Sequence, residues 1–502
     1  MTTASKRMRW AGITAVLTVV NMGVGLLAQR WLASRLGTGS TADAFQTGVA
    51  FPTAIATAFM AGIPTALVPT FVARREHHQS LLSRNEAWGL LVFSLALMAT
   101  VMTCAEWLAS IIGATDRSSI ANFLRVSALL FPIVAAAAVG QANLYSQNRY
   151  GFSSSSGAAN GAGLLLSLAL IGGASPTIEK LALCVVCGYL AQFLWIAVGF
   201  QGLRGGQRTP TTSAVLPVLL LVGSYLVLRL QSVVERSLAV GLGTGAAATL
   251  GYAAKVQSGF ILLAGFGVSV VALPAASAHA AAGAMLKVKR TLEEAFQLTA
   301  AAVLVACAAG WALAVPIVQT VLATGAFPDS DIVPTAHVIR AGLLAVAVGG
   351  LSGPLVAILY ASQARRRVVA SGVAGLLVGL TSSLVLRHPF GTKGIVIGSG
   401  LGNCAAFAVQ FIAVRRLLHG WSPWAALSRV RVPFAWLAAT TLAFALIVGR
   451  IAATKRVGPS LPFLVVLGLV FVGVCAPMAI WTVVKIRSTD PEFAESDRGA
   501  AI

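Results

Sequence analysis

The tetrapeptide Leu36-Gly37-Thr38-Gly39 returns 206 positions later as Leu242-Gly243-Thr244-Gly245. Two further pairs recur in the same order: 62–69 with 267–274, at an offset of 205, and 144–147 with 359–363, at an offset of 215 to 216. Chance could give one match in a chain rich in alanine, glycine and leucine, but three ordered matches favour an internal duplication. A half-molecule repeat is typical of secondary transporters, in which two similar bundles rock about a central site.

The composition indicates a membrane protein. The chain has 502 residues, of which 57% are hydrophobic and only 10% are charged, whereas soluble domains carry about 25% charged residues. The formal net charge of +21 would suggest a nucleic-acid partner in a soluble protein. Here the basic residues form short clusters between apolar runs, so membrane topology and anionic lipid explain them better, and we expect no nucleic-acid partner.

Apolar runs long enough to span a bilayer predict an all-α polytopic membrane protein with about 14 transmembrane helices. The predicted helices cover 10–35, 42–73, 86–112, 119–145, 153–173, 180–203, 213–239, 246–277, 292–323, 335–361, 367–387, 394–418, 432–453 and 460–485. Pro52, Pro64 and Pro69 lie inside the second run, and Pro274 closes the eighth. Because proline removes a helical hydrogen bond, we expect these helices to be bent or broken.

Loop charge predicts the orientation. Lysine and arginine gather in alternate loops and near both termini, as at residues 74–84, 204–208, 287–290, 365–367 and 415–431. By the positive-inside rule both termini are cytoplasmic. The repeat spans six helices, an even number, so the two lobes are parallel. We expect an N-lobe at 1–209 (helices 1–6), a C-lobe at 210–420 (helices 7–12), two additional helices at 421–489, and a cytoplasmic tail at 490–502.

Several short motifs resemble the MurJ/MviN family, which contains lipid II flippases of the multidrug/oligosaccharidyl-lipid/polysaccharide exporter superfamily. The first is Leu-Gly-Thr-Gly-Ser-Thr-Ala-Asp-Ala-Phe at 36–45. Further similar pieces, in family order, are Phe-Pro at 51–52, Leu-Val-Pro-Thr-Phe at 67–71, the segment 143–149, Tyr-Ala-Ala-Lys at 252–255, Thr-Gly-Ala-Phe at 324–327 and Leu-Tyr-Ala at 359–361. The resemblance covers most of the first ten predicted helices.

The resemblance implies two lobes around a cationic cavity formed by helices 1, 2, 7 and 8. It also implies alternating access that moves an undecaprenyl-pyrophosphate-linked sugar from the inner to the outer leaflet. In the family, arginines of helices 1, 2 and 8 are thought to grip the pyrophosphate. This sequence departs there, with Met22, Ala28 and Ala56 at three of those positions. Lys255 keeps a positive charge at the helix-8 position, and the aspartate of Ala-Asp-Ala-Phe is kept as Asp43.

Charged residues at membrane depth are candidate functional sites, because burying a charge in a bilayer is costly. We predict that Lys255, Arg30, Arg236, Arg229 and Gln29 bind substrate. Lys255 could instead pair with an acid or reach water, and Arg30 could be an interfacial anchor beside Trp31. Asp43 and Glu235 are predicted gating or structural residues; for Asp43, capping of the first turn of its own helix is the main alternative. Arg125 and Arg340 occupy corresponding helices, which predicts structural pairing within each lobe.

No enzyme, cofactor or metal site is indicated. No glycine-rich loop ends in Gly-Lys-Ser/Thr, and the clustered His77 and His78 lack metal-ligand spacing. Cys184 and Cys187 have redox or metal spacing without a polar setting, which favours a packing role.

The sequence therefore predicts a MurJ-like flippase of the inner (cytoplasmic) membrane, not an enzyme. Its partners would be a polyprenyl-pyrophosphate-linked saccharide, with lipid II first, the bilayer, and cell-wall or polysaccharide synthesis proteins. Three alternatives remain open: a flippase for exopolysaccharide or O-antigen units, a drug/cation antiporter of the same superfamily, and a membrane scaffold that has lost transport.

Overall fold

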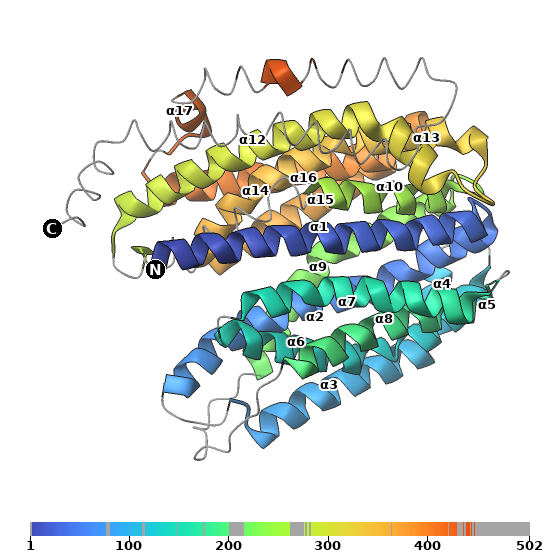
Figure 1. Ribbon diagram of the computed structural model, residues 1–502, viewed down its shortest axis with the longest axis horizontal. Coiled ribbons are helices and arrows are strands. Elements are labelled where there is room, and N and C mark those ends of the chain that lie inside the picture. Colours follow the sequence, from blue (N-terminus) through green and yellow to red (C-terminus); the bar gives the residue numbers. More distant parts are fainter. Residues whose placement is uncertain are drawn as a thin grey trace. The chain divides into compact units, whose positions relative to one another are not determined.

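The structure is a computed structural model in which every regular element of the described residues is a helix (Figure 1). It describes residues 3–76, 81–112, 116–147, 149–173, 176–199, 215–261, 276, 279–280, 283–362, 364–419, 421–428, 435, 438–441, 443 and 446. In this part of the chain, ten helices are long and apolar enough to cross a membrane. The predicted helices 432–453 and 460–485 lie almost wholly outside the described residues.

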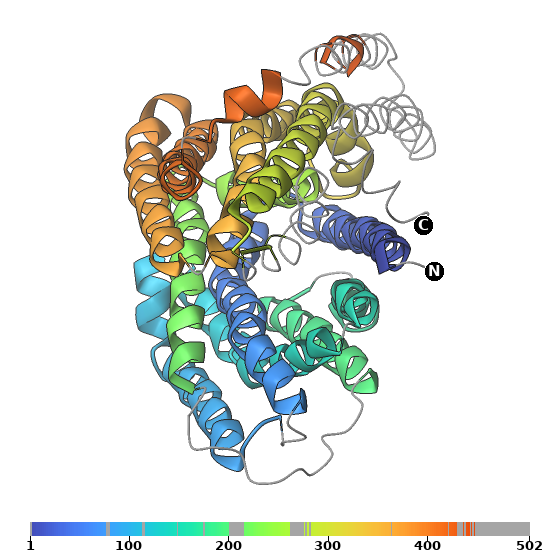
Figure 2. The same cartoon turned by 90° about the vertical axis from the view of Figure 1, so that its left-hand side faces the viewer.

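The chain divides into two compact units, and the first comprises Met1–Lys255, Leu322–Asp331 and Ser383–Ile395. Its helices are α1 (Thr3–Leu36), α2 (Ser40–Glu76), α3 (Arg84–Thr103), α4 (Ala105–Ile112), α5 (Arg117–Ser127), α6 (Leu130–Ser146), α7 (Tyr150–Ser167), α8 (Ile178–Val198), α9 (Val215–Val240) and the first part of α10 (Ala246–Ile261). Helix α2 packs along α6 and α9, while α7 lies between α1 and α8 (Figures 1 and 2). Two of the helices that carry predicted site residues, α2 and α9, are therefore direct neighbours.

The second unit comprises Val256–Val321, Ile332–Ser382 and Val396–Ile502. Its helices are α12 (Met285–Ile317), α13 (Ile332–Ala341), α14 (Leu343–Ala361), most of α15 (Arg365–Phe390), most of α16 (Thr392–Leu417) and α17 (Pro423–Ser428). Trp421 is buried in the core of this unit and makes an edge contact with the ring of Phe296, at 5.5 Å between centroids. The predicted division into two six-helix lobes stays a prediction.

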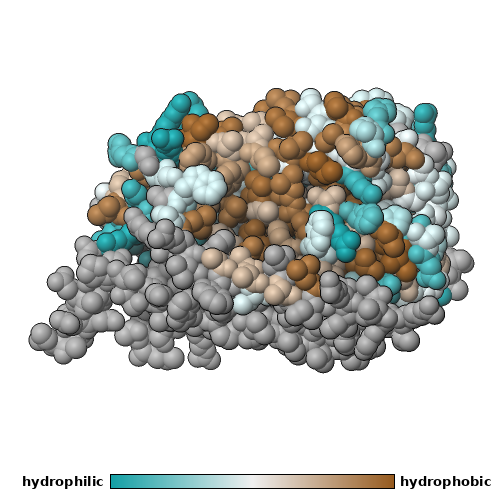
Figure 3. Space-filling model, turned by 90° about the horizontal axis from the view of Figure 1, so that it is seen from above, coloured by the Kyte–Doolittle hydropathy of each residue, from teal (hydrophilic) through white to brown (hydrophobic). Residues whose placement is uncertain are grey.

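Large apolar side chains lie exposed on many of these helices, among them Trp107 on α4, Leu194 on α8 and Val385 on α15. In the space-filling view of Figure 3, hydrophobic residues occupy the middle of the visible face, and most hydrophilic residues gather toward its ends. An apolar belt between polar ends is what a bilayer requires of a spanning protein. The chain is a multi-pass membrane protein.

Two predicted helices are each divided at corresponding places of the repeat. The run 119–145 is divided between α5 and α6, and the run 335–361 between α13 and α14. At the second break the side-chain amide of Gln257 donates to the carbonyls of Val338 and Ile339, at 3.0 and 3.4 Å. A β-carbon at Gly342 would lie only 1.9 Å from that amide nitrogen, so the contact requires glycine. Gln257 thus supports the end of α13.

Of the two expectations for the second helix, bent or broken, the break is wrong, because α2 continues through Pro52, Pro64 and Pro69. Threonine hydroxyls next to Pro52 and Pro64 donate to carbonyls one turn earlier: Thr53 to Val49 at 2.6 Å, and Thr65 to Ala61 at 2.7 Å. These carbonyls are adjacent to the ones that the prolines leave without a helical amide, those of Gly48 and Met60. The helix passes its prolines without ending.

Arg125 and Arg340 both make contacts inside their own unit, Arg125 with a carboxylate and Arg340 with a backbone carbonyl and an aromatic ring. The Arg125 guanidinium lies 2.9 Å from the Glu106 carboxylate. The Arg340 Nε donates to the carbonyl of Trp311 at 3.0 Å, and its guanidinium lies 5.4 Å from the centroid of the Trp311 ring.

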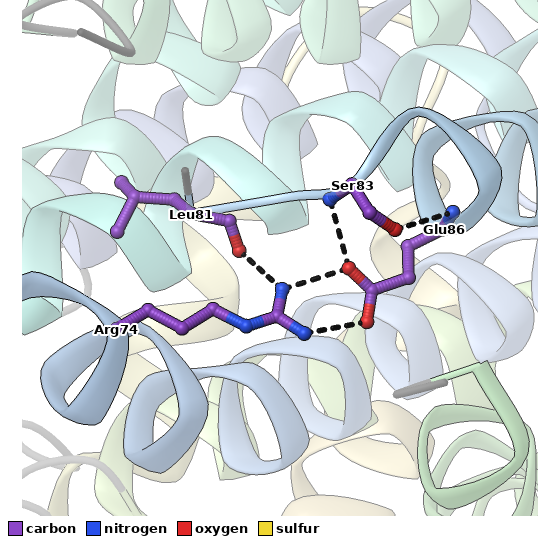
Figure 4. Close-up of polar contacts among 4 residues, drawn as sticks. All are labelled: Arg74, Leu81, Ser83 and Glu86. Atoms are coloured by element: carbon purple, nitrogen blue, oxygen red, sulfur yellow. Dashed lines mark hydrogen bonds and ion pairs between the residues drawn. The ribbon is translucent and has the colours of Figure 1, made fainter. Parts of the chain in front are cut away.

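The connection from α2 to α3 is fixed by a buried ion pair (Figure 4). Both guanidinium Nη atoms of Arg74 donate to the carboxylate of Glu86, at 2.7 and 2.8 Å, and one also donates to the Leu81 carbonyl at 2.8 Å. Glu86 accepts from the backbone amide of Ser83 at 2.9 Å, and the Ser83 hydroxyl accepts from the amide of Glu86. Arg74, predicted to be one of the loop cations, is thus a buried structural residue.

The first glycine turn of the repeat joins α1 to α2, and the second joins α9 to α10. Gly37 has a φ of 56°, and Gly245 has a φ of 88°. Asp43 of α2 crosses to the second turn, where its carboxylate accepts from the backbone amides of Gly245 and Ala248, at 2.6 and 2.7 Å. A carboxylate is favoured at a helix N-terminus, where amides are unpaired and the dipole is positive. Asp43 therefore caps α10 rather than only its own helix.

Other family-like motifs meet at the same two turns. The hydroxyl of Tyr252 on α10 donates to the carbonyl of Gly37 at 2.9 Å. The backbone amide of Ala326 donates to the carbonyl of Ser34 on α1 at 2.9 Å. We call residues 34–43, 243–252 and 324–327 together the turn cluster; all lie in the first unit. The turn cluster fixes where α10 begins.

We expect Glu86→Gln to lower the free energy of unfolding by about 3–5 kcal/mol, because it leaves the buried Arg74 without its counter-charge. The matched control is Glu106→Gln, which removes a half-exposed pair and should change it by about 0–1 kcal/mol. Thermal unfolding in detergent, followed by tryptophan fluorescence, compares them. Equal effects of the two variants would contradict a structural role for the buried pair.

We expect Asp43→Ala to destabilise the protein by about 0.5–2 kcal/mol, the usual effect of losing a helix cap. Asp43→Asn should be milder, because asparagine also accepts from helix N-terminal amides. The melting temperatures should fall in the order wild type, Asp43→Asn, Asp43→Ala. An Asp43→Ala protein that melts like the wild type would show that the cap adds no stability.

Candidate functional site

Lys255 lies on α10, nearly two turns after Ala248, whose amide Asp43 binds. Its side chain is exposed and passes Gly25 of α1. A β-carbon at Gly25 would lie 3.3 Å from the Lys255 Cε and 3.7 Å from its Nζ. The absence of a side chain at Gly25 therefore gives the lysine its path along α1.

Arg236 on α9 is the second cation of the site. Its guanidinium donates to the main-chain carbonyl of Gln46 on α2. Arg236 and Lys255 share Gln46 as a neighbour, because Arg236 donates to its carbonyl and Gly251, one turn before Lys255 on α10, meets its side chain. Two cations held near each other favour an anion between or beside them, and guanidinium and ammonium groups both bind phosphate oxygens well. On the same helix, Glu235 accepts from the side-chain amide of Gln231 at 2.9 Å.

Gln46 joins four helices at this site, although the sequence analysis did not select it. Its side-chain amide donates to the Oε1 of Gln29 on α1 at 3.4 Å, while its main-chain carbonyl receives Arg236. A β-carbon at Gly251 of α10 would lie 2.3 Å from the Gln46 Oε1. The sequence did contain a signal for Gln46, because it is a polar residue in an apolar helix. It follows Asp43 by three positions, so the two side chains lie on neighbouring parts of the helix surface.

The predicted residues are thus only partly brought together. Gln46 contacts both Arg236 and Gln29. Lys255 lies against Gly25, which is on the same helix as Gln29. Arg30 is half-buried on α1, and Arg229 is exposed on α9, two turns before Arg236. Asp43 lies in the turn cluster and Glu235 on α9, as described above. Their roles in binding and gating stay predictions.

The three positions at which the resemblance implies arginines differ in their surroundings. Ala28 and Ala56 are packed inside the first unit, with 1% and 0% of their surface exposed, whereas Met22 is half-buried. An arginine at either alanine would have to displace packed neighbours. These three positions of α1 and α2 therefore carry no charge, and Arg30 is the predicted site cation of α1.

Comparison with known proteins gives a consistent picture. The family model described as "Lipid II flippase MurJ" matches residues 32–483. A curated protein of Rhizobium meliloti (strain 1021), "Probable lipid II flippase MurJ", is 24% identical over 410 residues, covering 74% of each chain.

Solved structures share the fold. A structure of the lipid II flippase MurJ in an inward closed conformation has a TM-score of 0.72 at 15% identity, covering 95% of this chain and 98% of that one. An inward-facing multidrug resistance transporter of the MATE family, in the MOP superfamily, has a TM-score of 0.68 at 13% identity, covering 81% and 98%. The fold is common to both families, whereas the family model extends over most of this sequence. The chain belongs to the MurJ family of lipid II flippases.

Proposed function

We propose that this protein moves lipid II, the polyprenyl-pyrophosphate-linked peptidoglycan precursor, from the inner to the outer leaflet of the cytoplasmic membrane by alternating access. Membership of a flippase family supports this proposal, as does the placement of Lys255 and Arg236 around Gln46. Both termini would be cytoplasmic, in line with the loop charges. The family match favours neither of the other transport alternatives, export of other polysaccharide units or of drugs.

The observation that carries the binding proposal is the placement of Lys255. Its side chain is exposed although α10 is otherwise largely buried along Leu250–Phe260. A lysine ammonium donates up to three hydrogen bonds, and the charged oxygens of a pyrophosphate are strong acceptors for them. In this proposal Lys255 and Arg236 hold the pyrophosphate, and Gln29 and Gln46 position Arg236 and the face of α1.

Complementation of a lipid II flippase depletion strain tests the function. We expect the wild-type chain to restore growth and cell shape. Failure of a well-expressed, membrane-inserted protein to do so would contradict lipid II as the substrate. Growth restored only in an exopolysaccharide or O-antigen transport mutant would favour the corresponding alternative.

For the binding site, we expect Lys255→Gln to weaken lipid II binding about 10- to 100-fold, because charged hydrogen bonds are worth about 1.5–3 kcal/mol. Lys255→Arg should retain most of the affinity. The control is Lys180→Gln, at an exposed lysine in the first turn of α8. Binding of fluorescent lipid II to the purified proteins gives the comparison, and an unaltered affinity for Lys255→Gln would remove Lys255 from the site.

A pair of glycines on α1 tests the path of the lysine side chain. Gly25→Val places methyl groups where the Lys255 Cε lies, so we expect weaker lipid II binding. Gly23→Val makes the same change two residues earlier, where a β-carbon meets no atom within 4 Å. It should bind like the wild type. If both variants bind equally well, the contact between Gly25 and Lys255 has no part in recognition.

A further inference from the structure

A groove outside the cationic site lies among α3, α6 and α8 of the first unit. Its volume is about 360 Å³, which is near the lower end of the range for small-molecule sites. The principal lining side chains are Leu90, Leu91, Pro132, Val139, Phe193 and Ile196. All three helices are apolar and long enough to contribute to membrane spans.

The groove opens to the surface along one side. Among its lining residues Ala87, Leu91, Ala136 and Ala197 are exposed, whereas Leu90 and Ile196 are buried. Next to the opening, Val92 and Leu194 have 57% and 53% of their surface exposed. Exposed aliphatic side chains on membrane-spanning helices face lipid chains. The open side of the groove is therefore in contact with the bilayer.

The chemistry of the lining admits hydrocarbon only. The polar side chain among the lining residues is Ser94, and its hydroxyl already donates to the carbonyl of Leu91 at 2.8 Å. A sugar or peptide in this groove would lose its hydrogen bonds to water without replacement, which is unfavourable. An alkyl chain would lose nothing and would fill the space.

One end of the groove has the features of a membrane interface. The lining residue Leu82 follows Leu81, whose carbonyl accepts a hydrogen bond from Arg74 (Figure 4). Arg84 is exposed at the first residue of α3, one turn from the lining residue Ala87. Trp88, which follows Ala87 on α3, has 52% of its surface exposed. Tryptophan and arginine together mark the level of the lipid head groups, and a cation there attracts anionic lipid.

We propose that this groove holds one acyl chain of an anionic bilayer phospholipid, with the lipid phosphate at Arg84. The site is separate from the cationic site, and it concerns a resident lipid rather than the transported one. The buried Arg74–Glu86 pair shapes its end by fixing the loop that carries Leu82. The function of the protein as a flippase is not a premise of this assignment.

Photo-crosslinking tests the groove. The full-length protein is placed in phosphatidylcholine vesicles that contain phosphatidylglycerol with a diazirine on one acyl chain, and the labelled peptides are mapped. We expect adducts concentrated on 84–103, 130–146 and 178–198. Ala136→Phe fills the groove from its open side and should abolish this concentration, as should Ala197→Phe from α8. Ala96→Phe, at an exposed position of α3 outside the groove, should keep it.

Two outcomes would overturn the site. The first is labelling of the wild type that spreads evenly over all of its lipid-facing helices. The second is a labelling pattern in Ala136→Phe and Ala197→Phe that equals the wild-type pattern, when both variants elute as folded protein. The head-group part is tested by Arg84→Gln and by a phosphatidylcholine probe with the same diazirine chain. The reference is the yield of adducts from the wild type with the phosphatidylglycerol probe. The Arg84→Gln variant with that probe, and the wild type with the phosphatidylcholine probe, should both give a lower yield. Equal yields would contradict a phosphate at Arg84.

Discussion

The contact between the Asp43 carboxylate and the first amides of α10 is the interaction on which the candidate site depends. At 2.6 and 2.7 Å it is a pair of short, charge-assisted hydrogen bonds to a helix N-terminus. It joins the glycine turn of one repeat to the glycine turn of the other. Lys255 follows seven residues after Ala248 on the same rigid helix, so fixing the start of α10 also fixes where the lysine meets Gly25.

Polar groups in the membrane-spanning helices of the first unit serve one another as partners. Gln46 contacts Gln29 through its side chain and Arg236 through its carbonyl, and it requires the bare backbone of Gly251. In a bilayer such groups are costly unless they are paired or reach water. Three positions at which the resemblance implies arginines hold Met22, Ala28 and Ala56, and both alanines are packed inside the first unit.

Hydropathy was enough to place the ten membrane spans of the described residues, because long apolar runs have few alternatives in a membrane protein. The sequence did not predict the breaks within 86–112, 119–145 and 335–361, since each run is apolar on both sides of its break. The break at Gly342 depends on the distant Gln257. The capping of α10 by Asp43 was also missed, because its partners are backbone amides, which every residue possesses. Lys255 could be selected from its position, but its path past Gly25 could not.

Hydrogen exchange at the second glycine turn tests the central claim most directly. The amides of Gly245 and Ala248 are the ones that Asp43 binds, so mass spectrometry of a peptide covering 243–250 should show faster exchange in Asp43→Ala than in the wild type. Exchange in α3, which has no contact with Asp43, should stay the same. Unchanged exchange at 243–250 in Asp43→Ala would show that the carboxylate does not hold the two turns together.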